Sequence, residues 1–389
     1  MRKRIAILGS TGSVGRQALD VAAAHPERFA VVALAASQLS AAFQRQLDTW
    51  QPPLAAVSAP SAAGDVRAGL LAGEDALARL AAECDADLVV VGVPGRVGLL
   101  PTLAALESGK SVALANKESL VMAGHLVMAA AEAHGAAVLP VDSEHNAIWQ
   151  CLRGEGGAEG PTTEVASLIL TASGGAFRDL PVAALGSVTP AEALRHPTWS
   201  MGPKITVDSA TLMNKGLEII EASWLFGVPL ERVRVVMHRE SIVHSLVEFV
   251  DGSLKALLAV PDMRLPIQYA LSYPERWPCP VPRLDLAQLG TLSFGEVDRE
   301  RFRCMYVALE AARAGGTYPA ALSGADDEAV RLFLAGALQF DRIADVVEAV
   351  LARHRSTVAA SLEGVLEADA WAREVCRELV CTGAASEVA

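Results

Sequence analysis

The sequence predicts an α/β fold in its first part, an α+β domain in its middle and a helical domain at its end. Three observations support this. Short β-branched runs alternate with Ala- and Leu-rich stretches up to about residue 142. From about residue 143 strand-like runs come close together, and after about residue 298 only helical patterns appear. Because alternating strands and helices are typical of a parallel sheet with right-handed crossovers, we expect a Rossmann-like, doubly wound sheet first.

The strands expected in the first part are short apolar runs, as in strands buried on both faces of a parallel sheet. Helix-like segments lie between them, such as residues 16–24 and 74–83. The expected strands are residues 4–8, 30–35, 87–93, 111–115 and 137–141.

The middle part predicts a mixed or antiparallel sheet, because its strand-like runs follow one another closely. These runs are residues 167–171, 234–237, 243–250 and 253–260, with helices between residues 211 and 224. The Pro-rich stretch 273–284 predicts irregular structure. Helices are expected at residues 301–314, 326–335, 341–353 and 366–379. The predicted boundaries are a first domain at 1–142, a second at 143–272, a linker at 273–300 and a helical domain at 301–389.

The composition argues against several kinds of partner and location. A formal net charge of −12 makes nucleic acid an unsuitable partner. No uncharged apolar run reaches the roughly 18 to 20 residues that span a bilayer, and the first apolar run is too short for a signal peptide. The six cysteines form no C-x-x-C pair, so neither a zinc site nor a disulfide framework is expected. We expect a cytoplasmic protein that binds neither nucleic acid nor a membrane.

A glycine-rich turn follows the first expected strand and precedes the first helix. Gly9, Gly12 and Gly15 lie in GSTGSVG. Glycine permits the tight turn and the close approach of a pyrophosphate, whose charge the helix N-terminus meets. This context predicts a dinucleotide site.

The end of the second strand reads Ala36, Ser37, Gln38. An acidic residue at this place bonds the ribose hydroxyls of NAD, and a basic residue favours NADP. The sequence has neither, so the residues alone leave the choice between NADPH and NADH open.

Two carboxylates, Asp142 and Glu144, follow the last expected strand of the first part, with Ser143 between them. In an extended chain, residues two apart point to the same side. At the carboxyl end of a parallel sheet that side is where ligands bind. The pair is expected to hold a cation or a shared proton, and the alternative is a solvated loop.

A second cluster, NKGLEIIE, begins at Asn214. On a helix Asn214, Glu218 and Glu221 share one face, and Lys215 lies beside Glu218. Hydroxyl and amide groups with one lysine suit a phosphate, and carboxylates suit Mg²⁺ or Mn²⁺. The alternative is an ion pair on a surface helix. The hydroxyl-rich run just before the cluster is Thr206, Asp208, Ser209 and Thr211.

Two loops complete the set of candidates. The loop 196–203 places Trp199 and Met201 between Pro and Gly, as in a lid that excludes water. Ser173 and the two glycines after it resemble an anion nest. His238 and His244 flank a strand, and a satisfied core histidine is the simpler interpretation of each.

Five segments then occur in an informative order, over roughly the first 270 residues: GSTGSVG (9–15), ANKESLV (115–121), LPVDSEHNAI (139–148), LTASGGAFR (170–178) and HPTWSMGPKITVDSATLMNKGLEIIEA (196–222). They resemble the motifs of the 1-deoxy-D-xylulose 5-phosphate reductoisomerase family, in that family's order. The third and the last are long and very specific.

The resemblance implies an NADPH- and metal-dependent conversion of 1-deoxy-D-xylulose 5-phosphate to 2-C-methyl-D-erythritol 4-phosphate in non-mevalonate isoprenoid biosynthesis, by a homodimer. Mn²⁺ or Mg²⁺ is the expected cation, with Co²⁺ as a further candidate. The resemblance assigns the metal to Asp142, Glu144 and Glu218, and the substrate to Ser143, Lys117, Ser173, His196, Ser209, Asn214 and Lys215. It assigns the lid to Trp199 and Met201, and the cofactor to Thr11, Gly12, Ser13, Val14, Ala36, Ser37, Gln38, Asn116, Glu118 and Gly202. Lys117 and His244 are the candidates for proton transfer.

The chain departs from the family pattern at two places. The second strand commonly ends in Gly, a basic residue and Asn, where this chain has Ala36, Ser37 and Gln38. Arg239 stands where the family usually has proline. Two other functions remain as alternatives: a simple NAD(P)-dependent dehydrogenase, which needs no cation, and a dinucleotide-sensing or scaffold protein without activity.

Overall fold

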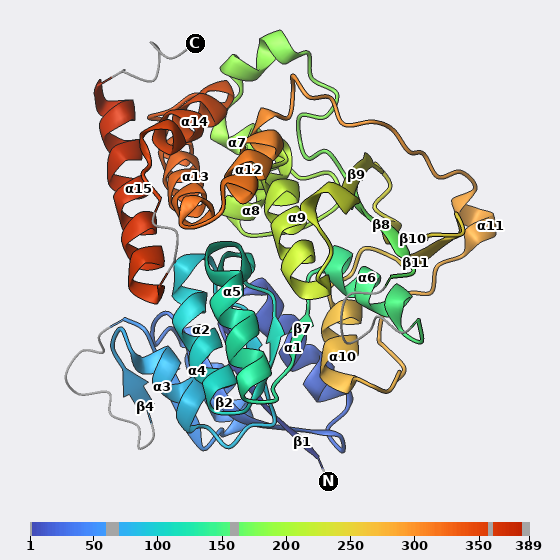
Figure 1. Cartoon of the computed structure of the whole chain (residues 1–389). Coiled ribbons are helices and arrows are strands. Elements are labelled where there is room, and N and C mark those ends of the chain that lie inside the picture. Colours follow the sequence, from blue (N-terminus) through green and yellow to red (C-terminus); the bar gives the residue numbers. More distant parts are fainter. Residues whose placement is uncertain (1, 60–69, 156–162, 357–360, 383–389) are drawn as a thin grey trace. The chain divides into compact units, whose positions relative to one another are not determined.

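The computed structural model describes residues 2–59, 70–155, 163–356 and 361–382, and Figure 1 labels its elements. Contacts between Cα atoms divide the chain into two compact units. Unit 1 comprises Met1–Ser119, Gly124–Trp149 and Asp262–Arg283, and unit 2 comprises Leu120–Ala123, Gln150–Pro261 and Leu284–Ala389. Each unit is built around its own sheet.

Unit 1 contains a seven-stranded sheet in the order β4-β3-β2-β1-β5-β6-β7, in which all neighbouring strands are parallel. The five predicted strands are confirmed as β1 (Lys3–Leu8), β2 (Phe29–Ala36), β5 (Leu88–Val91), β6 (Ser111–Leu114) and β7 (Val138–Pro140). The sequence analysis missed β3 (Leu54–Val57) and β4 (Leu70–Ala72). Both are short, and Ala-rich β3 follows two prolines, so neither has the β-branched pattern of a strand.

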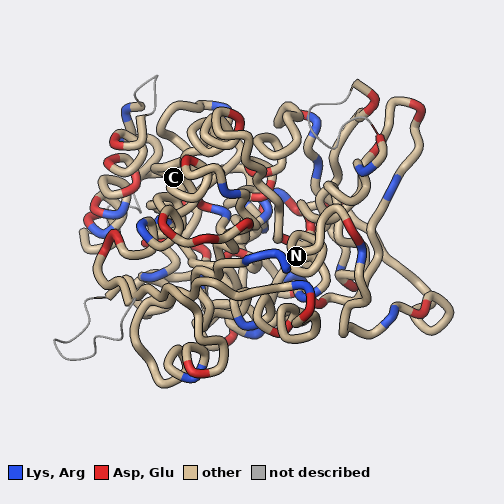
Figure 2. The backbone as a smooth tube through the Cα atoms, turned by 90° about the horizontal axis from the view of Figure 1, so that it is seen from below, with Lys and Arg blue, Asp and Glu red and all other residues tan. Residues whose placement is uncertain are grey.

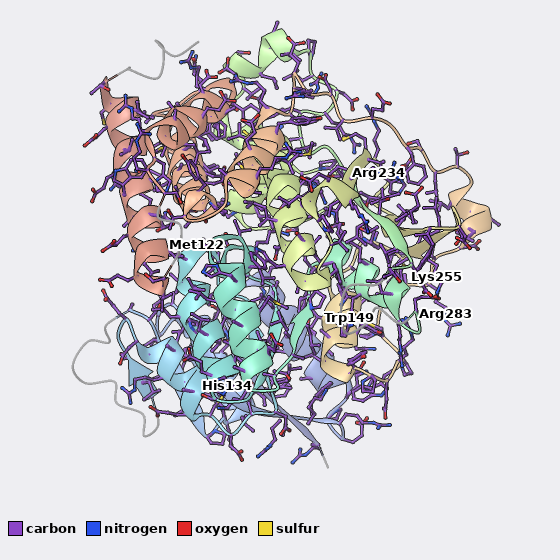
Figure 3. All side chains as sticks on the ribbon, viewed as in Figure 1. Met122, His134, Trp149, Arg234, Lys255 and Arg283 are labelled. Carbon is purple, nitrogen blue, oxygen red and sulfur yellow. The ribbon has the colours of Figure 1, made fainter. Side chains whose placement is uncertain are left out.

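The first helix of unit 1 is amphipathic and buries one face. In α1 (Ser13–Ala24) the buried residues include Gly15, Ala18 and Ala22, at the spacing of one helical face. Trp149, labelled in Figure 3, packs against Tyr269 and Tyr273 with ring centroids 4.8 and 4.6 Å away. The other helices with residues in this unit are α2 (Ala41–Trp50), α3 (Ala76–Glu83), α4 (Leu99–Glu107), α5 (Lys117–Ala133), α6 (Ser143–Leu152) and α10 (Arg264–Ser272).

Unit 2 contains a mixed sheet in the order β11-β10-β8-β9. Strands β8 and β9 are parallel, whereas β10 is antiparallel to both of its neighbours. The prediction of a mixed or antiparallel sheet is therefore confirmed. The strands are β8 (Val165–Ala172), β9 (Val233–Met237), β10 (Val243–Phe249) and β11 (Leu254–Leu258).

The helices of unit 2 form one core that includes the C-terminal part of the chain. Val207, Met213 and Leu217 belong to the same buried cluster as Ala308 and Leu322. The unit division therefore differs from the predicted boundaries, because the apolar faces of the last helices are covered by the middle of the chain. The helices of this core are α7 (Pro190–Ala193), α8 (Pro203–Thr211), α9 (Met213–Phe226), α12 (Arg303–Ala314), α13 (Tyr318–Leu334), α14 (Ile343–Arg353) and α15 (Leu362–Thr382). The short α11 (Leu286–Leu289) belongs to the same unit but has no buried residue.

Acidic and basic residues are interspersed along the chain (Figure 2), and the net charge is −12. No helix among the described residues is both long and apolar enough to cross a bilayer. No disulfide joins the six cysteines, which all lie in described segments.

Candidate active site

The glycine-rich turn lies between β1 and α1, where only backbone can fit. Gly9 has φ of +80°, and a Cβ there would lie 2.7 Å from the carbonyl oxygen of Gly92. A Cβ on Gly15 would lie 2.2 Å from the carbonyl oxygen of Gly9. Gly12 is the extended N-cap of α1 and offers no capping side chain. The open amides at this helix N-terminus are therefore available to a phosphate group.

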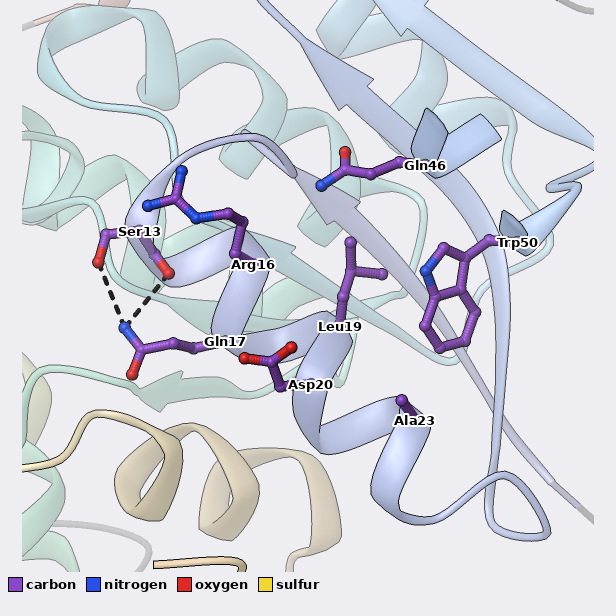
Figure 4. A pocket seen from close by; sticks show the side chains of 8 residues that line it. All are labelled: Ser13, Arg16, Gln17, Leu19, Asp20, Ala23, Gln46 and Trp50. Carbon is purple, nitrogen blue, oxygen red and sulfur yellow. Dashed lines mark hydrogen bonds between the residues drawn. The ribbon is translucent and has the colours of Figure 1, made fainter. Parts of the chain in front are cut away.

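Side chains of α1 and α2 hold this turn in place. Gln46 accepts from the Ser10 hydroxyl at 2.7 Å and donates to the Ser10 carbonyl at 2.8 Å. Arg16 donates to the carbonyl of Thr11 at 2.6 Å. Beside the turn, a pocket of about 370 Å³ opens between the two helices, with Trp50 and Leu19 in its wall (Figure 4).

The end of β2 carries no charge. Ala36 is buried, and Ser37 and Gln38 after it are exposed. Their polar groups face solvent as a hydroxyl and an amide, which contact a ribose or a phosphate equally well.

Asn116 organises the chain after β6. Its side chain caps α5 by accepting from the Ser119 amide at 2.9 Å. Its Nδ2 donates to the carbonyls of Val93 and Gly95 and to Glu118, at 3.0, 2.9 and 2.7 Å. Asn116 and Glu118 are thus fixed at the same sheet edge as the glycine-rich turn, because parallel strands end together.

The two carboxylates after β7, Asp142 and Glu144, do not lie in an extended segment as expected. Asp142 precedes α6, but Ser143 and Glu144 form the first turn of that helix. The argument from an extended chain was therefore wrong. Lys117 forms an ion pair with Asp142, and the Ser143 hydroxyl lies 3.0 Å from both oxygens of Glu144.

The sequence analysis also missed His145. Its ring is fully buried, and Nδ1 lies 3.9 Å from Asp142. The signal was present, since a residue three positions after Asp142 returns to the same face of a helix.

In unit 2, α9 buries a charged cluster. The carboxylate of Glu218 accepts from Asn214 Nδ2 and from Lys215 Nζ, both at 2.5 Å. Glu218 is 0% exposed and Lys215 is 5% exposed. A surface ion pair is therefore excluded. Buried charges are costly unless they are paired or bind an ion, so this cluster is a strong candidate for a functional site.

His196 joins two serines from different elements. Its Nε2 lies 3.0 Å from the Ser173 hydroxyl and 3.1 Å from the Ser209 hydroxyl. Its Nδ1 accepts from the backbone amides of Thr198 and Trp199, so the neutral ring carries its proton on Nε2. Burial, with a smaller effect of nearby Arg178, lowers the pKa of His196 to about 4. The sequence analysis did not single out Arg178.

The remaining candidates lie in or near the loop before α8. Trp199 and Met201 are half-buried, and Gly202 is the N-cap of α8. The Trp199 ring lies 6.1 Å from that of His244. His238 accepts from the amides of Ile242 and Val243, as expected for a core histidine. His244 Nε2 lies 3.2 Å from the carbonyl oxygen of Ala259.

The site residues predicted from the sequence thus form two sets, each within one unit. Unit 1 holds Thr11, Gly12, Ser13, Val14, Ala36, Ser37, Gln38, Asn116, Lys117, Glu118, Asp142, Ser143 and Glu144. Unit 2 holds Ser173, His196, Trp199, Met201, Gly202, Ser209, Asn214, Lys215, Glu218 and His244.

Family models match most of the chain. Residues 5–124 match 1-deoxy-D-xylulose 5-phosphate reductoisomerase, residues 138–226 match its C-terminal domain, and residues 258–375 match a further DXP reductoisomerase C-terminal domain. The chain belongs to the 1-deoxy-D-xylulose 5-phosphate reductoisomerase family.

Family members resemble this chain along nearly its whole length. The reductoisomerase of Thermomicrobium roseum is 52% identical over 384 residues, which cover 98% of each chain. That of Geobacillus kaustophilus is 51% identical and covers 97% of this chain and 100% of its own. Among solved structures, the Zymomonas mobilis reductoisomerase in complex with NADPH has a TM-score of 0.90 at 40% identity, covering 98% and 99% of the two chains.

A second reductoisomerase structure, in complex with NADPH, fosmidomycin and magnesium, has a TM-score of 0.90 at 38% identity. It covers 97% of this chain and 98% of its own. The predicted fold class is confirmed by these matches.

Proposed function

We propose that this chain converts 1-deoxy-D-xylulose 5-phosphate to 2-C-methyl-D-erythritol 4-phosphate with NADPH and a divalent metal ion, the committed step of non-mevalonate isoprenoid synthesis. The observation that carries the proposal is membership of the family at 52% identity over 98% of the chain. The buried charges of α9 and the backbone turn at α1 supply the chemistry that such a reaction needs.

The donor set fits a hard divalent cation. We assign its ligands as Asp142, Glu144 and Glu218, because carboxylate oxygens are what Mg²⁺ and Mn²⁺ prefer. Two of these carboxylates have a lysine that compensates their negative charge. Lys117 pairs with Asp142, and Lys215 pairs with Glu218. When bound, the cation polarises the ketone and neighbouring hydroxyl and stabilises the negative charge of the rearrangement. Co²⁺ is a further candidate.

The chain's own polar groups hold the substrate. Ser143 and Lys117 contact its carbon backbone, and Ser173, His196, Ser209, Asn214 and Lys215 hold its phosphate. Binding energy from the phosphate, away from the reacting carbons, orients the substrate. The neutral His196 donates a hydrogen bond from Nε2, and Lys215 supplies the positive charge.

The lid and the cofactor site complete the assignment. Trp199 and Met201 cover the reacting centre and exclude water from it. Thr11, Gly12, Ser13 and Val14 line the site of the NADPH pyrophosphate, and the amides of Thr11, Ser13 and Val14 are its donors, since the Gly12 amide donates to the carbonyl of Gly9 at 2.9 Å. Ala36, Ser37 and Gln38 contact its adenosine ribose, and Asn116, Glu118 and Gly202 line the remaining cofactor site. Hydride then passes from the nicotinamide to the aldehyde formed by rearrangement.

Proton transfer is assigned to Lys117 or His244. Lys117 is 7% exposed and paired with Asp142, and His244 is 5% exposed. Lysine and histidine are both residue types that act as general acids and bases.

We further propose that the chain is a cytoplasmic homodimer. The edge strand β11 supports self-association, since Leu254 and Leu258 on it are 55% and 37% exposed. Sedimentation analysis tests this, and a monomer at micromolar concentration contradicts it.

The decisive experiment measures oxidation of NADPH and of NADH by the purified chain with 1-deoxy-D-xylulose 5-phosphate, with and without Mn²⁺ or Mg²⁺. We expect turnover only with metal, and the methylerythritol phosphate as product by mass spectrometry. Turnover that survives chelation supports a simple dehydrogenase instead. Binding of NADPH without turnover, under all metal conditions, supports a sensing or scaffold role.

A further inference from the structure

Helix α8 connects the parts of unit 2 that are assigned to the substrate phosphate. It follows the loop of Trp199 and Met201, and its last turn carries Ser209. It joins α9, with Asn214 and Lys215, through the single residue Leu212 at φ of +56°. The position of α8 therefore determines the position of most of the phosphate-binding groups.

The serine loop after β8 also packs directly on α8. A Cβ on Gly175 would lie 2.5 Å from the Cα of Ala210. Ser173, two residues earlier, is hydrogen-bonded to His196, which is hydrogen-bonded to Ser209. A small rotation of α8 therefore changes the distance between the two serine hydroxyls that His196 joins.

A buried charge cluster ties α8 to α13. Lys204 Nζ, in the first turn of α8, lies 2.6 Å from Asp208 and 2.8 Å from Asp326 of α13. Asp208 is 1% exposed and Asp326 is 0% exposed. The other side chains of α8 that face this core, such as Val207 and Ala210, are apolar and make no directional contacts.

The cluster places two buried carboxyl groups beside one ammonium group. Burial raises the pKa of Asp326, and Lys204 offsets this effect only in part. The Lys204 ammonium lies within ion-pair distance of both Asp208 and Asp326, so Lys204 is the contact through which α8 is held to α13.

Stability alone is a weak reason for such a cluster. Replacing a buried ion pair by well-packed apolar side chains is often neutral or stabilising. Apolar contacts do not depend strongly on direction, whereas hydrogen bonds do. Hydrogen bonds therefore fix the angle and register of two helices more narrowly than dispersion contacts do.

We propose that Asp326 is a positioning residue, which holds α8 through Lys204 and so sets the geometry of the phosphate-binding groups Ser173, His196, Ser209, Asn214 and Lys215. The inference rests on the proposed function, since it assigns those groups to the phosphate of the substrate. Asp326 itself touches neither substrate nor cofactor.

The test compares Asp326→Leu with Asp326→Asn. Asparagine has the shape of the protonated acid and keeps a hydrogen-bond acceptor for Lys204, whereas leucine keeps only the volume. For Asp326→Leu we expect the KM for the phosphosugar to rise about tenfold, with the KM for NADPH within about twofold of the parent chain. For Asp326→Asn we expect both constants within about twofold. A role in stability alone lowers the melting temperature and the active fraction, but leaves the KM of the folded enzyme unchanged.

A triple variant, Lys204→Met with Asp208→Leu and Asp326→Leu, covers the case in which Asp326→Leu does not fold. Apolar replacement of the whole cluster is compatible with folding, yet it removes every directional contact. We expect it to melt within a few degrees of the parent chain, and to bind inorganic phosphate about tenfold more weakly in calorimetry.

A phosphosugar KM and a phosphate affinity within twofold of the parent chain in the triple variant would overturn the proposal. Equal losses for the phosphosugar and NADPH would overturn it as well. Phosphate binding is measured without turnover, so a failure of the proposed reaction is distinguishable from a failure of this inference.

Discussion

The glycine-rich turn of unit 1 and the α8–α9 region of unit 2 are both candidate phosphate sites, but they are built from different parts of the chain. In the turn, the candidate binding groups are backbone amides, and Gly9 and Gly15 leave no room for a Cβ. In the α8–α9 region, the candidate binding groups are side chains, and Glu218, Lys215 and His196 depend on partners from other segments or turns. Binding at the backbone turn should therefore respond to substitutions that add side-chain volume. Binding at the buried charged cluster should respond to substitutions that remove a charge.

The largest effect expected is that of Glu218→Gln, which keeps volume and removes charge. Loss of a metal ligand removes several kcal/mol of charge stabilisation, so we expect kcat/KM to fall on the order of a thousandfold. The affinity for NADPH, measured by fluorescence, should not change. The matched control is Glu328→Gln, another buried glutamate in an i,i+3 ion pair, with Arg331. If both variants lose activity equally, the charge of Glu218 has no special role.

The converse change is Gly15→Ala, which adds volume and no charge. Its Cβ would lie 2.2 Å from the Gly9 carbonyl oxygen, whereas a Cβ on Gly12 would lie 3.2 Å away. Overpacking costs about 1–3 kcal/mol, so we expect the dissociation constant for NADPH to rise by about one to two orders of magnitude. Gly12→Ala should show a smaller rise. Equal effects in calorimetry would contradict a steric origin.

A third, smaller effect concerns the end of β2, where neither charge nor tight packing acts. Ser37 is exposed, and Ser37→Arg adds a cation next to the 2′-phosphate of NADPH. We expect the ratio of kcat/KM for NADPH to that for NADH to rise about tenfold. Ser37→Asp should lower this ratio by like-charge repulsion. A ratio that stays constant in both variants would show that the phosphate binds elsewhere.

The smallest effect is a pH dependence confined to unit 2. Burial lowers the pKa values of His196 and His354 in the folded chain. Between about pH 6.5 and 4 these histidines are therefore protonated in the unfolded chain but neutral in the folded chain. Protonation thus favours the unfolded chain, and the free energy of unfolding falls as the pH falls. Urea titrations at pH 7 and 5.5 measure this. His196→Gln should lessen the difference, and an unchanged difference would contradict the assignment.

The fold was largely predictable because its signals are local. The apolar runs of β1, β2, β5, β6 and β7 are bounded by turns, and each is read within a few residues. Strands β3 and β4 were not predicted, because their composition does not favour a strand. Their extended conformation is stabilised by hydrogen bonding to the neighbouring strands of the sheet. The common core of the middle and C-terminal helices could not be predicted either. An amphipathic pattern shows which face of a helix is buried, but not which other helix covers that face.

Residue types and spacing named candidate site residues, but they did not give the geometry of the site. Asp142, Ser143 and Glu144 were singled out as if they lay in an extended chain, whereas a helix begins at Ser143. The bonds of His196 to Ser173 and Ser209 span 23 and 13 residues. The periodicity of a helix or a strand relates residues only a few positions apart, so it cannot predict contacts over such sequence separations.

By itself, the sequence determined five strands of the first sheet, the backbone turn at Gly9–Gly15 and the helical face of Asn214 and Glu218, because each depends on residues within a few positions of one another. Only the tertiary structure decided that Glu218 is buried, that His196 is neutral, and that Lys204 meets Asp326 across more than a hundred residues. Burial and the pairing of distant charges depend on which surfaces pack together, and that depends on the whole chain.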